Sequence, residues 1–388
     1  MLLTELENSF SKYRNVFYFC KFDRSNMISG RETLMFGNSD PINESSDAGR
    51  FFERISSITA LKASMLPILI PFDFVTTIYH DIRVHRSSLP LLQTFEPSVT
   101  MHGSLTRPDS PIPAKESIPF TESSMEGKVS DAISRIRSGE LLQVVLSMKF
   151  PVDDMDPVES LKRFVLKDSS LYAFLYKTDD LIIVGSSPEN LVTRRGSELE
   201  IFPIAGTRKR SRNASEDQAL GSELLRSEKD KLEHRMLVDL ARNDLGKVSE
   251  AGSVKVTDSM DLRKYSSVQH LVSRVSSSLL AGRSDIDIIK SVFPAGTVSG
   301  APKKRALQVI GEYEEAPRGA YSGAIGIISR EDLDLALLIR SIFSYSGRNE
   351  TQAGAGIVKD SDPKKEVQEM FDKSLTVMGG AVHASPDN

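Results

Sequence analysis

Residues 171–202 read LYAFLYKTDDLIIVGSSPENLVTRRGSELEIF, and this stretch decides the fold class. It contains three short apolar runs, which turn residues separate from one another: Tyr172–Leu175, Leu181–Val184 and Leu199–Phe202. Runs of this length, bounded by Gly, Pro, Asn, Asp and Ser, are typical of strands joined by tight turns. The stretch therefore predicts an antiparallel meander.

Helices and further strands surround this meander in the sequence. Apolar residues at helical spacing predict a helix over 125–136, a second from Asp156 with Pro157 at its first position, and one long helix over 214–245. We also expect helices at 302–312 and 362–377, and strands at 141–146, 253–256, 268–275, 323–328 and 335–343. Strands and helices do not alternate strictly, so the sequence predicts an α+β fold.

A proline-rich segment divides the chain. Residues 1–103 carry short β-rich runs at 16–19, 66–70 and 74–79. Residues 104–123 contain four prolines with several Ser and Thr, a composition that favours an extended connector. We therefore predict an N-terminal portion over 1–103, a connector over 104–123 and a core over 124–388.

The composition excludes several classes of function. Lys and Arg number 49 against 53 Asp and Glu, and this balance argues against nucleic acid or an anionic membrane as a partner. The single Cys20 cannot form an internal disulfide, and no Cys/His cluster exists for structural zinc. The first residues lack the pattern of a signal peptide, so we expect a soluble, cytoplasmic protein.

Common catalytic motifs are missing. The sequence has no P-loop, no H-E-x-x-H and no G-x-S-x-G. Residues 353–356 read AGAG, but Lys359 stands where a dinucleotide fingerprint needs its third glycine, and the strand-like Ile357 and Val358 follow where that fingerprint has a helix. The sequence thus predicts neither a Rossmann site nor the usual NTPase, zinc protease or hydrolase sites.

Two acidic pairs lie on predicted helices. Asp230 and Glu233 are three residues apart, as are Glu366 and Glu369, so each pair presents two carboxylates on one helix face. Facing pairs can hold a hard dication such as Mg²⁺ through oxygen ligands. Each pair taken singly is more typical of a solvated helix face.

Three other positions are candidates for binding or catalysis. Glu189 stands in a turn between apolar runs, where partial burial would raise its pKa and suit a proton donor, although an ordinary turn Glu is more common. His270 alternates with Gln269 on a predicted strand, where a satisfied core histidine is the usual finding. Residues 293–302, FPAGTVSGAP, lead into a helix start that suits an anion and equally suits a well-capped helix.

Taken in their order along the chain, these segments resemble the chorismate-utilising enzymes over about residues 120–380. The blocks that carry the resemblance are QVVLS at 143–147, GSSPE at 185–189, PIAGTR at 203–208, EHRMLVDLARND at 233–244, and residues 268–275, 293–305, 321–324, 339–341 and 352–369. The resemblance implies a layered sandwich of large, mostly antiparallel β-sheets flanked by helices.

Two positions place the chain near the anthranilate synthase component I branch of that family. Gln143 stands where isochorismate and salicylate synthases carry a Lys that activates water. Ala205 stands where aminodeoxychorismate synthases often carry a nucleophilic Lys. The resemblance implies conversion of chorismate and ammonia to anthranilate and pyruvate in tryptophan biosynthesis. The alternatives are component I of an aminodeoxychorismate synthase, in folate synthesis, or a catalytically silent regulatory paralogue.

The resemblance also implies roles for individual residues. Glu189 would donate a proton to the C4 hydroxyl, His270 would act in the loss of pyruvate, and Gln143 and Thr297 would complete the catalytic set. Glu233 and Glu369 would ligate Mg²⁺, with Asp230 and Glu366 behind them; Asp230 replaces the usual Glu at its position. The residues implied to bind chorismate are Gly206, Thr207, Tyr321, Arg340, Gly354, Gly356 and Lys373.

The resemblance finally implies a partner and raises a question about regulation. Neutral ammonia is scarce near neutral pH, and the chain has no amidotransferase domain, so a separate glutamine amidotransferase subunit is expected. Relatives carry tryptophan-binding motifs where this chain reads KFDRS at 21–25 and DSSLYA at 168–173. An effector site in residues 1–103 is therefore expected to be altered or absent.

Overall fold

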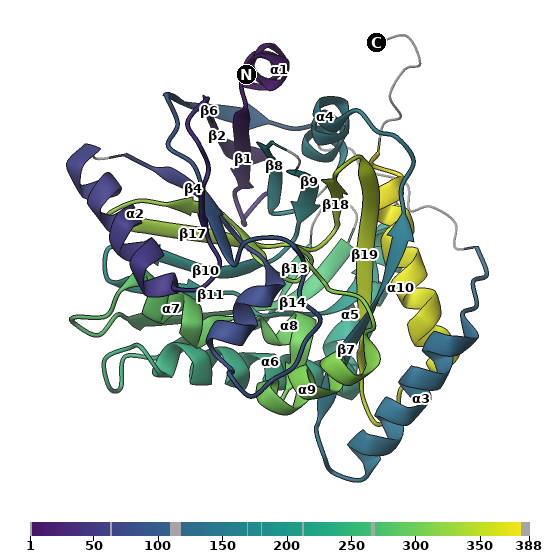
Figure 1. Ribbon diagram of the computed structural model, residues 1–388. Helices are drawn as coiled ribbons and strands as arrows, with labels where there is room; N and C mark the ends of the chain where they lie inside the picture. Colours follow the sequence, from purple (N-terminus) through teal and green to yellow (C-terminus); the bar gives the residue numbers. More distant parts are fainter. Residues whose placement is uncertain are drawn as a thin grey trace.

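The structure is a computed structural model that describes residues 2–62, 64–108, 118–168, 170–179, 181–211, 213–264 and 268–381. Its strands form two large sheets, and helices cover their outer faces (Figure 1). The strand pairings in both sheets are antiparallel. The predicted α+β layered sandwich is therefore confirmed.

The first sheet, sheet A, has nine strands in the order β15-β7-β19-β18-β9-β8-β1-β2-β6. Their bounds in that order are Gly300–Ala301, Gln143–Pro151, Arg348–Ile357, Ser341–Tyr345, Leu181–Ser187, Tyr172–Thr178, Asn15–Phe22, Ser29–Gly37 and Val99–Thr106. Strands from the beginning, middle and end of the chain thus lie side by side in one sheet.

The second sheet, sheet B, has ten strands, nine of them in the order β12-β14-β11-β10-β17-β16-β4-β5-β3, with β13 paired to β14. Their bounds are Ile204–Lys209, Val268–Ser278, Glu198–Ile201, Asn190–Arg195, Asp332–Leu337, Ala324–Ile328, Leu66–Ile70, Leu92–Thr94 and Ile42–Glu44, with β13 at Lys255–Lys264.

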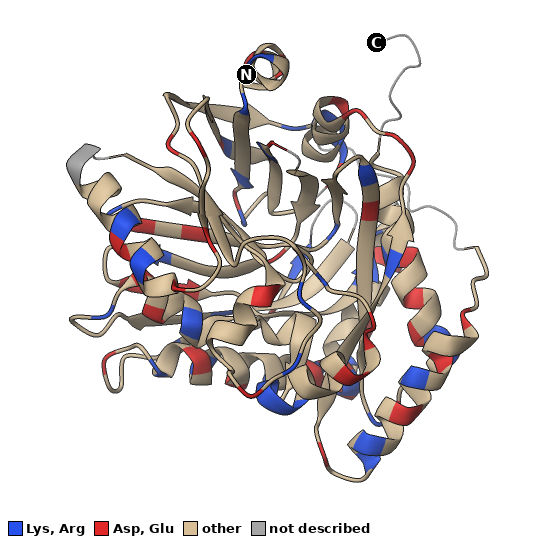
Figure 2. Ribbon diagram, in the orientation of Figure 1, with Lys and Arg blue, Asp and Glu red and all other residues tan. Residues whose placement is uncertain are grey.

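The helices lie outside these sheets. They are α1 (Leu2–Lys12), α2 (Ala48–Lys62), α3 (Ser123–Arg137), α4 (Pro157–Lys167), α5 (Ala214–Arg226), α6 (Glu228–Gly246), α7 (Asp285–Val292), α8 (Gly296–Ser299), α9 (Lys303–Tyr313) and α10 (Pro363–Met378), with a 3₁₀ helix η1 at Phe72–Thr77. Basic and acidic residues are interspersed along α2, α3 and α10 (Figure 2). No helix among the described residues is long and apolar enough to cross a membrane.

Alternation along the strands builds two apolar layers. On β16, Ile325 and Ile327 pack between the two sheets, in one cluster with Phe17 and Phe174 of sheet A. Ala324 and Ile328 point the other way, and on that face they join a cluster with apolar residues of α2, α7 and α9. Because side chains alternate across a strand, each central strand of sheet B contributes to both layers.

The N-terminal portion completes both sheets. Strand β1 pairs with β8 and with β2, and β4 pairs with β16. Strand β6 extends to Thr106 and α3 begins at Ser123, at the two ends of the predicted connector. Residues 109–117 of that connector lie outside the described residues.

Four expected elements differ from the prediction. The meander divides between the sheets, because β8 and β9 belong to sheet A whereas β10, which we did not predict, and β11 belong to sheet B. The expected long helix breaks at Ser227, whose backbone is extended and whose side chain accepts the Asp230 N–H. Most of the expected strand at 74–79 lies instead in η1, which ends at Thr77 and where the buried Asp73 carboxylate accepts two hydrogen bonds from Ser87.

The expected strand at 335–343 is two strands in two sheets. Strand β17 ends at Leu337 in sheet B, and β18 begins at Ser341 in sheet A. Between them Arg340 has φ +51°, a left-handed conformation that interrupts strand geometry. Residues 335–343 contain no Gly, Pro, Asn or Asp to mark a turn, which is why the sequence did not reveal the break.

Candidate active site

The candidate acid lies where the chain crosses from one sheet to the other. Glu189 stands between β9 of sheet A and β10 of sheet B, and its backbone carbonyl accepts the Leu337 N–H at 3.0 Å. Its carboxylate oxygen Oε1 accepts a hydrogen bond from Thr297 Oγ1 at 2.8 Å. Thr297 belongs to α8, so the predicted helix-start segment delivers its hydroxyl to the acid.

Burial sets the proton affinity of this carboxyl. It raises the pKa of Glu189 to about 7, and the Thr297 hydrogen bond and the charges of Arg340, Arg24 and Lys373 only partly oppose it. A carboxyl with a pKa near neutrality exchanges protons at physiological pH, which is what general acid catalysis needs.

His270 occupies the neighbouring part of sheet B. It lies on β14 opposite Thr207 of β12, and its Nδ1 is 3.0 Å from Thr207 Oγ1 and 3.1 Å from the Gly206 carbonyl oxygen. Burial lowers the pKa of His270 to about 4, so the ring is neutral. A carbonyl only accepts, so a neutral ring that bonds Gly206 carries its hydrogen on Nδ1 and its lone pair on Nε2.

Gly206 is required at its position by both conformation and space. Its φ is +65°, and a Cβ there would lie 2.6 Å from Leu224 and 3.2 Å from the Asp230 carboxylate. The backbone that holds His270 therefore runs directly against the acidic helix α6.

A second group of predicted residues gathers around β19. Lys373 of α10 donates to the Gly354 carbonyl at 2.9 Å. A Cβ on Gly354 would lie 2.8 Å from the Tyr321 hydroxyl, and a Cβ on Gly356 would lie 2.5 Å from Gln143 Nε2. The glycines of the AGAG segment thus leave room for the Tyr321 and Gln143 side chains, inside a strand rather than in a phosphate loop.

Gln143 is buried, with 3% of its surface exposed, and its carbonyl oxygen Oε1 has no hydrogen-bond partner in the part of the chain that the structure describes. Buried polar atoms normally have a partner. The open acceptor of a side chain that lies against Gly356 marks this position as one that a ligand can complete.

The acidic pairs of α6 and α10 lie within electrostatic range of each other. Burial raises the pKa of Glu233 on α6, and the negative charges of Asp230 and of Glu369 on α10 raise it further. Burial, followed by the charge of Glu369, likewise raises the pKa of Glu366. Glu369 therefore acts both on Glu233 of the other helix and on Glu366 of its own helix, and sequence spacing could not establish the first of these effects.

Two carboxylates of this acidic cluster, which comprises Asp230, Glu233, Glu366 and Glu369, form ion pairs with cations. Asp230 is paired with Arg208 at 3.1 Å, and Glu369 with Lys373 at 2.7 Å. The pKa values of Glu233 and Glu366 stay raised, chiefly by burial, although the charges of Lys229 and Lys373 lower them. Among the described residues no group of three or more His, Cys, Asp or Glu side chains is arranged to hold a metal ion. The carboxylates of Glu233 and Glu369, which lie within electrostatic range of each other, have the oxygen donors that suit a Mg²⁺ with its remaining ligands from substrate and water.

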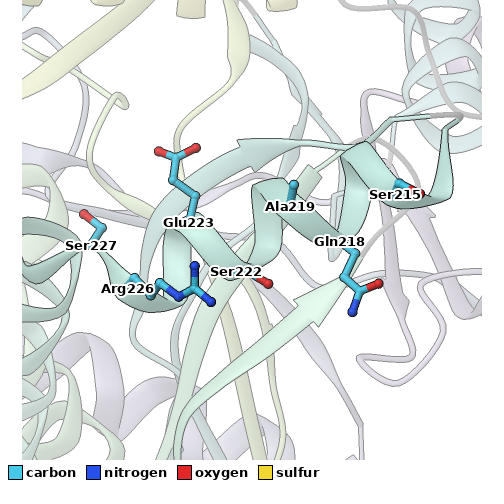
Figure 3. Close-up of a pocket in the computed structure, with 7 residues that line it drawn as sticks. All are labelled: Ser215, Gln218, Ala219, Ser222, Glu223, Arg226 and Ser227. Carbon is cyan, nitrogen blue, oxygen red and sulfur yellow. The ribbon is translucent and has the colours of Figure 1, made fainter.

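Two surface grooves lie near these elements. The larger, of about 710 Å³, follows one face of α5 between Ser215 and Ser227, and its lining residues include none of the predicted site residues (Figure 3). The other, of about 570 Å³, lies along α10 beside residues 119–121, and Glu369 and Lys373 are among its lining residues. The second groove gives solvent access to Glu369.

The sequence pattern of the chorismate binding enzyme family matches residues 76–379 of this chain, which is most of its length. The chain belongs to the chorismate binding enzyme family. The match begins within the N-terminal portion, before β5, and extends to the end of α10.

Similar proteins within the family include two kinds of component 1. The chain is 44% identical over 263 residues to anthranilate synthase component 1 of Aquifex aeolicus, covering 67% of this chain and 53% of that protein. It is 43% identical over 261 residues to aminodeoxychorismate synthase component 1 of Bacillus subtilis, covering 67% of this chain and 56% of that protein. The matches thus span about half the length of these curated relatives.

Solved structures agree on the fold. Anthranilate synthase component I from Streptococcus pneumoniae has a TM-score of 0.75 at 29% identity, over 95% of this chain and 92% of that chain. The menaquinone-specific isochorismate synthase from Escherichia coli has a TM-score of 0.74 at 20% identity, over 96% and 90%.

Sequence reasoning missed a buried network that supports the site of this family member. Arg318 donates to both oxygens of Glu314, to the Val298 carbonyl at 2.7 Å and to the Val145 carbonyl at 2.8 Å. Glu314 in turn accepts the N–H and the hydroxyl of Ser147. These bonds tie the residue after Thr297 to the strand that carries Gln143. Charged residues after a helix carry no pattern that predicts burial, so no sequence signal was available.

Proposed function

We propose that this chain is the large subunit of an anthranilate synthase, which converts chorismate and ammonia to anthranilate, pyruvate and water. The proposal rests on one observation above all. Glu189, with its pKa near neutrality, lies within the electrostatic reach of Lys373, and Lys373 pairs with Glu369 of the acidic cluster. Lys373 therefore links the candidate acid to the acidic cluster, where we propose that Mg²⁺ binds.

The first chemical task is to remove the C4 hydroxyl of chorismate. Hydroxide is a poor leaving group, so a proton must reach the oxygen as the C–O bond breaks. The Thr297 bond occupies Oε1 of Glu189, and Oε2 can carry the proton. The oxygen then leaves as water while the ammonia nitrogen bonds to C2, and Glu189 is left ionised.

The second task is to expel pyruvate. The hydrogen on C2 leaves as a proton, the bond between C3 and the enolpyruvyl oxygen breaks, and the methylene carbon of the enolpyruvyl group takes up a proton. Neutral His270, with its lone pair on Nε2, is suited to accept the C2 proton. The ring becomes aromatic, which makes the step favourable.

Substrate carboxylates need positive charge and donors. We propose that Arg340, Tyr321 and the backbone of Gly354 and Gly356 hold the enolpyruvyl carboxylate, because a guanidinium grips a carboxylate with two parallel bonds. We place Gly206, Thr207 and Lys373 in the same pocket. Mg²⁺ bound by Glu233 and Glu369, with Asp230 and Glu366 behind them, would neutralise the ring carboxylate.

Gln143 and Ala205 support amination by free ammonia. Neither side chain has a basic nitrogen to activate water or to attack the ring. Neither can take a proton from ammonium, so the nucleophile must enter the site as neutral ammonia. The relatives named component 1 support a partner subunit, and we propose that a glutamine amidotransferase supplies the ammonia. Cys20 offers no substitute, because it is buried and burial raises its pKa to about 12.

The second candidate is component I of an aminodeoxychorismate synthase. The chain is 43% identical to the Bacillus subtilis protein of that name and 44% identical to the Aquifex aeolicus anthranilate synthase component 1. Because these identities are nearly equal, they support this second candidate as well. The two enzymes place nitrogen at different ring positions. Their products therefore differ in fluorescence and absorption.

The test is product identification. The purified chain is incubated with chorismate, Mg²⁺ and an ammonium salt at mildly alkaline pH, and the aromatic product is separated and identified. We expect anthranilate. A 4-amino product would assign the chain to the second candidate, and isochorismate or no turnover would refute amination altogether.

A further inference from the structure

The turn between β1 and β2 reaches the crossover that carries the candidate acid. Arg24 in this turn donates from Nη2 to Asn190 Oδ1 at 3.1 Å. Its guanidinium carbon lies 3.7 Å from the centre of the Phe202 ring. A planar guanidinium that stacks on a ring and bonds an amide at the same time is held in one orientation.

The turn itself is braced from within. The Asp23 carboxylate accepts the Ser25 N–H at 2.7 Å, the Asp23 carbonyl accepts the Met27 N–H at 2.7 Å, and Asp23 N–H donates to Ser29 at 2.7 Å. These bonds fix the backbone on both sides of Arg24. The side chain therefore extends from a rigid base toward Asn190.

Asn190 is the residue next to Glu189. It is 2% exposed, it is the first residue of β10, and it pairs with Ala336 of β17. A contact that fixes the Asn190 side chain limits the freedom of the adjacent backbone. The orientation of the Glu189 carboxyl depends on that backbone.

Arg24 also contributes charge. Three cations act on Glu189 electrostatically, and they come from three parts of the chain: Arg340 from the connection between β17 and β18, Arg24 from the N-terminal turn, and Lys373 from α10. All three lower the pKa of Glu189 against burial, and Thr297 lowers it further through its hydrogen bond. Arg24 is the cation of the three that comes from the N-terminal portion.

We propose that Arg24 is a positioning residue for Glu189, which it orients through Asn190 and Phe202 while it supplies one of the three positive charges around the acid. The inference rests on the proposed function, because it assigns Arg24 to the acid of that reaction. It gives the first 103 residues a direct part in the chemistry of the core.

The test compares pH profiles of turnover with ammonium as nitrogen donor. Arg24→Gln removes the charge, Arg24→Lys keeps it, and Arg31→Gln is the matched control, since Arg31 is an exposed residue of the same hairpin. Dividing each variant's rate by the wild-type rate at the same pH cancels the supply of neutral ammonia. Glu189 acts when protonated, so a higher pKa extends activity to higher pH.

For Arg24→Gln we expect the alkaline limit of activity to move up by about half a pH unit or more, with the KM for chorismate nearly unchanged. Arg24→Lys should keep the wild-type limit at a reduced kcat, and Arg31→Gln should match wild type. Phe202→Leu, which removes the stacking ring, should move the limit in the same direction, and it serves as the test if Arg24→Gln does not fold.

The outcomes distinguish a failure of the proposed function from a failure of the inference about Arg24. Absence of turnover by the wild-type chain would refute the proposed function. Normal wild-type turnover with unshifted profiles in Arg24→Gln and Phe202→Leu would overturn the inference and leave the proposed function standing. An equal shift in Arg31→Gln would also overturn it, because the effect would then be one of general charge.

Discussion

At the scale of the residue, the surroundings of Glu189 have opposing effects on the pKa of its carboxyl group. Burial favours its neutral form, and Arg340, Arg24 and Lys373 favour the ionised form. The balance leaves a pKa of about 7, where either form is accessible at low cost. A general acid needs this balance, whereas a structural carboxylate would be fully paired.

The first prediction concerns catalysis by this residue. Glu189→Gln keeps the acceptor for the Thr297 hydroxyl but has no proton to give. We expect a fall in kcat of about 10² to 10⁴, the usual contribution of general acid catalysis. Steady-state rates with ammonium measure it, and near-normal turnover would show that another group protonates the leaving hydroxyl.

The second prediction concerns stability at the same position. The folded pKa lies above the unfolded value, so ionisation of Glu189 destabilises the folded protein as pH rises from about 4.5 to about 7. The glutamine of Glu189→Gln does not ionise, so this variant does not lose stability over that pH range. We expect equal unfolding free energies near pH 4 and, near pH 8, a more stable variant by at most about 3 kcal/mol.

Urea unfolding of both proteins at the two pH values measures this difference. Thr297→Val, which removes the hydrogen bond while leaving the carboxyl, is the comparison variant. A stability difference that stays constant with pH would contradict the raised pKa.

At the scale of the element, helices α6 and α10 bring their carboxylates into mutual range. The helices themselves were predictable from periodicity, and so were the pairs at Asp230 with Glu233 and at Glu366 with Glu369. The electrostatic range between them was not, because it depends on the order of strands in two sheets. Glu369 raises the pKa of both Glu233 and Glu366, and this coupling is a property of the fold.

The third prediction tests this helix pair. Glu369→Gln should fold normally and lose both Mg²⁺-dependent turnover and the rise in melting temperature that Mg²⁺ with chorismate gives the wild type. Glu228→Gln, on the exposed side of α6 where Glu228 pairs with Lys231, is the control and should behave as wild type. Wild-type turnover and stabilisation in Glu369→Gln would remove Glu369 from the metal site.

The fourth prediction concerns the break between α5 and α6. Ser227 caps α6 by accepting the Asp230 N–H at 3.3 Å, so it fixes the residue that borders Gly206. Ser227→Ala should cost about 1 kcal/mol of unfolding free energy, and Ser227→Asp should cost much less. Chemical denaturation measures both, and equal losses would show that the cap does not stabilise the helix.

At the scale of the whole molecule, the two sheets share their strands between distant parts of the chain. The sequence predicted the α+β class and most strands, because apolar runs and turn residues are local signals. It did not predict that β9 and β10, or β17 and β18, belong to different sheets. The apolar runs before and after such a crossover look alike in the sequence. Only the packing of the folded chain assigns the two strands to different sheets.

The candidate site shows the same limit. Residue types at Glu189, His270 and Thr297 were predictable from the family resemblance. The supporting contacts of Arg24 and Arg318 were not, because their partners lie far away in the sequence. Both residues act where strands from separate regions meet.

The fifth prediction follows from the position of Cys20 inside sheet A. The thiol is buried, so the chain alone should use ammonium but not glutamine as nitrogen donor. Turnover with each donor, measured with and without an added amidotransferase subunit, tests this. Glutamine-dependent turnover by the chain alone would contradict it.

The most direct test of the central claim is the stoichiometry of products under metal control. With chorismate, ammonium and Mg²⁺, we predict one anthranilate and one pyruvate for each chorismate consumed, complete loss of turnover on chelation, and recovery when Mg²⁺ is restored. Consumption of chorismate without pyruvate, or turnover that a chelator leaves unchanged, would contradict the claim that Glu189 and the α6 and α10 carboxylates act on one substrate.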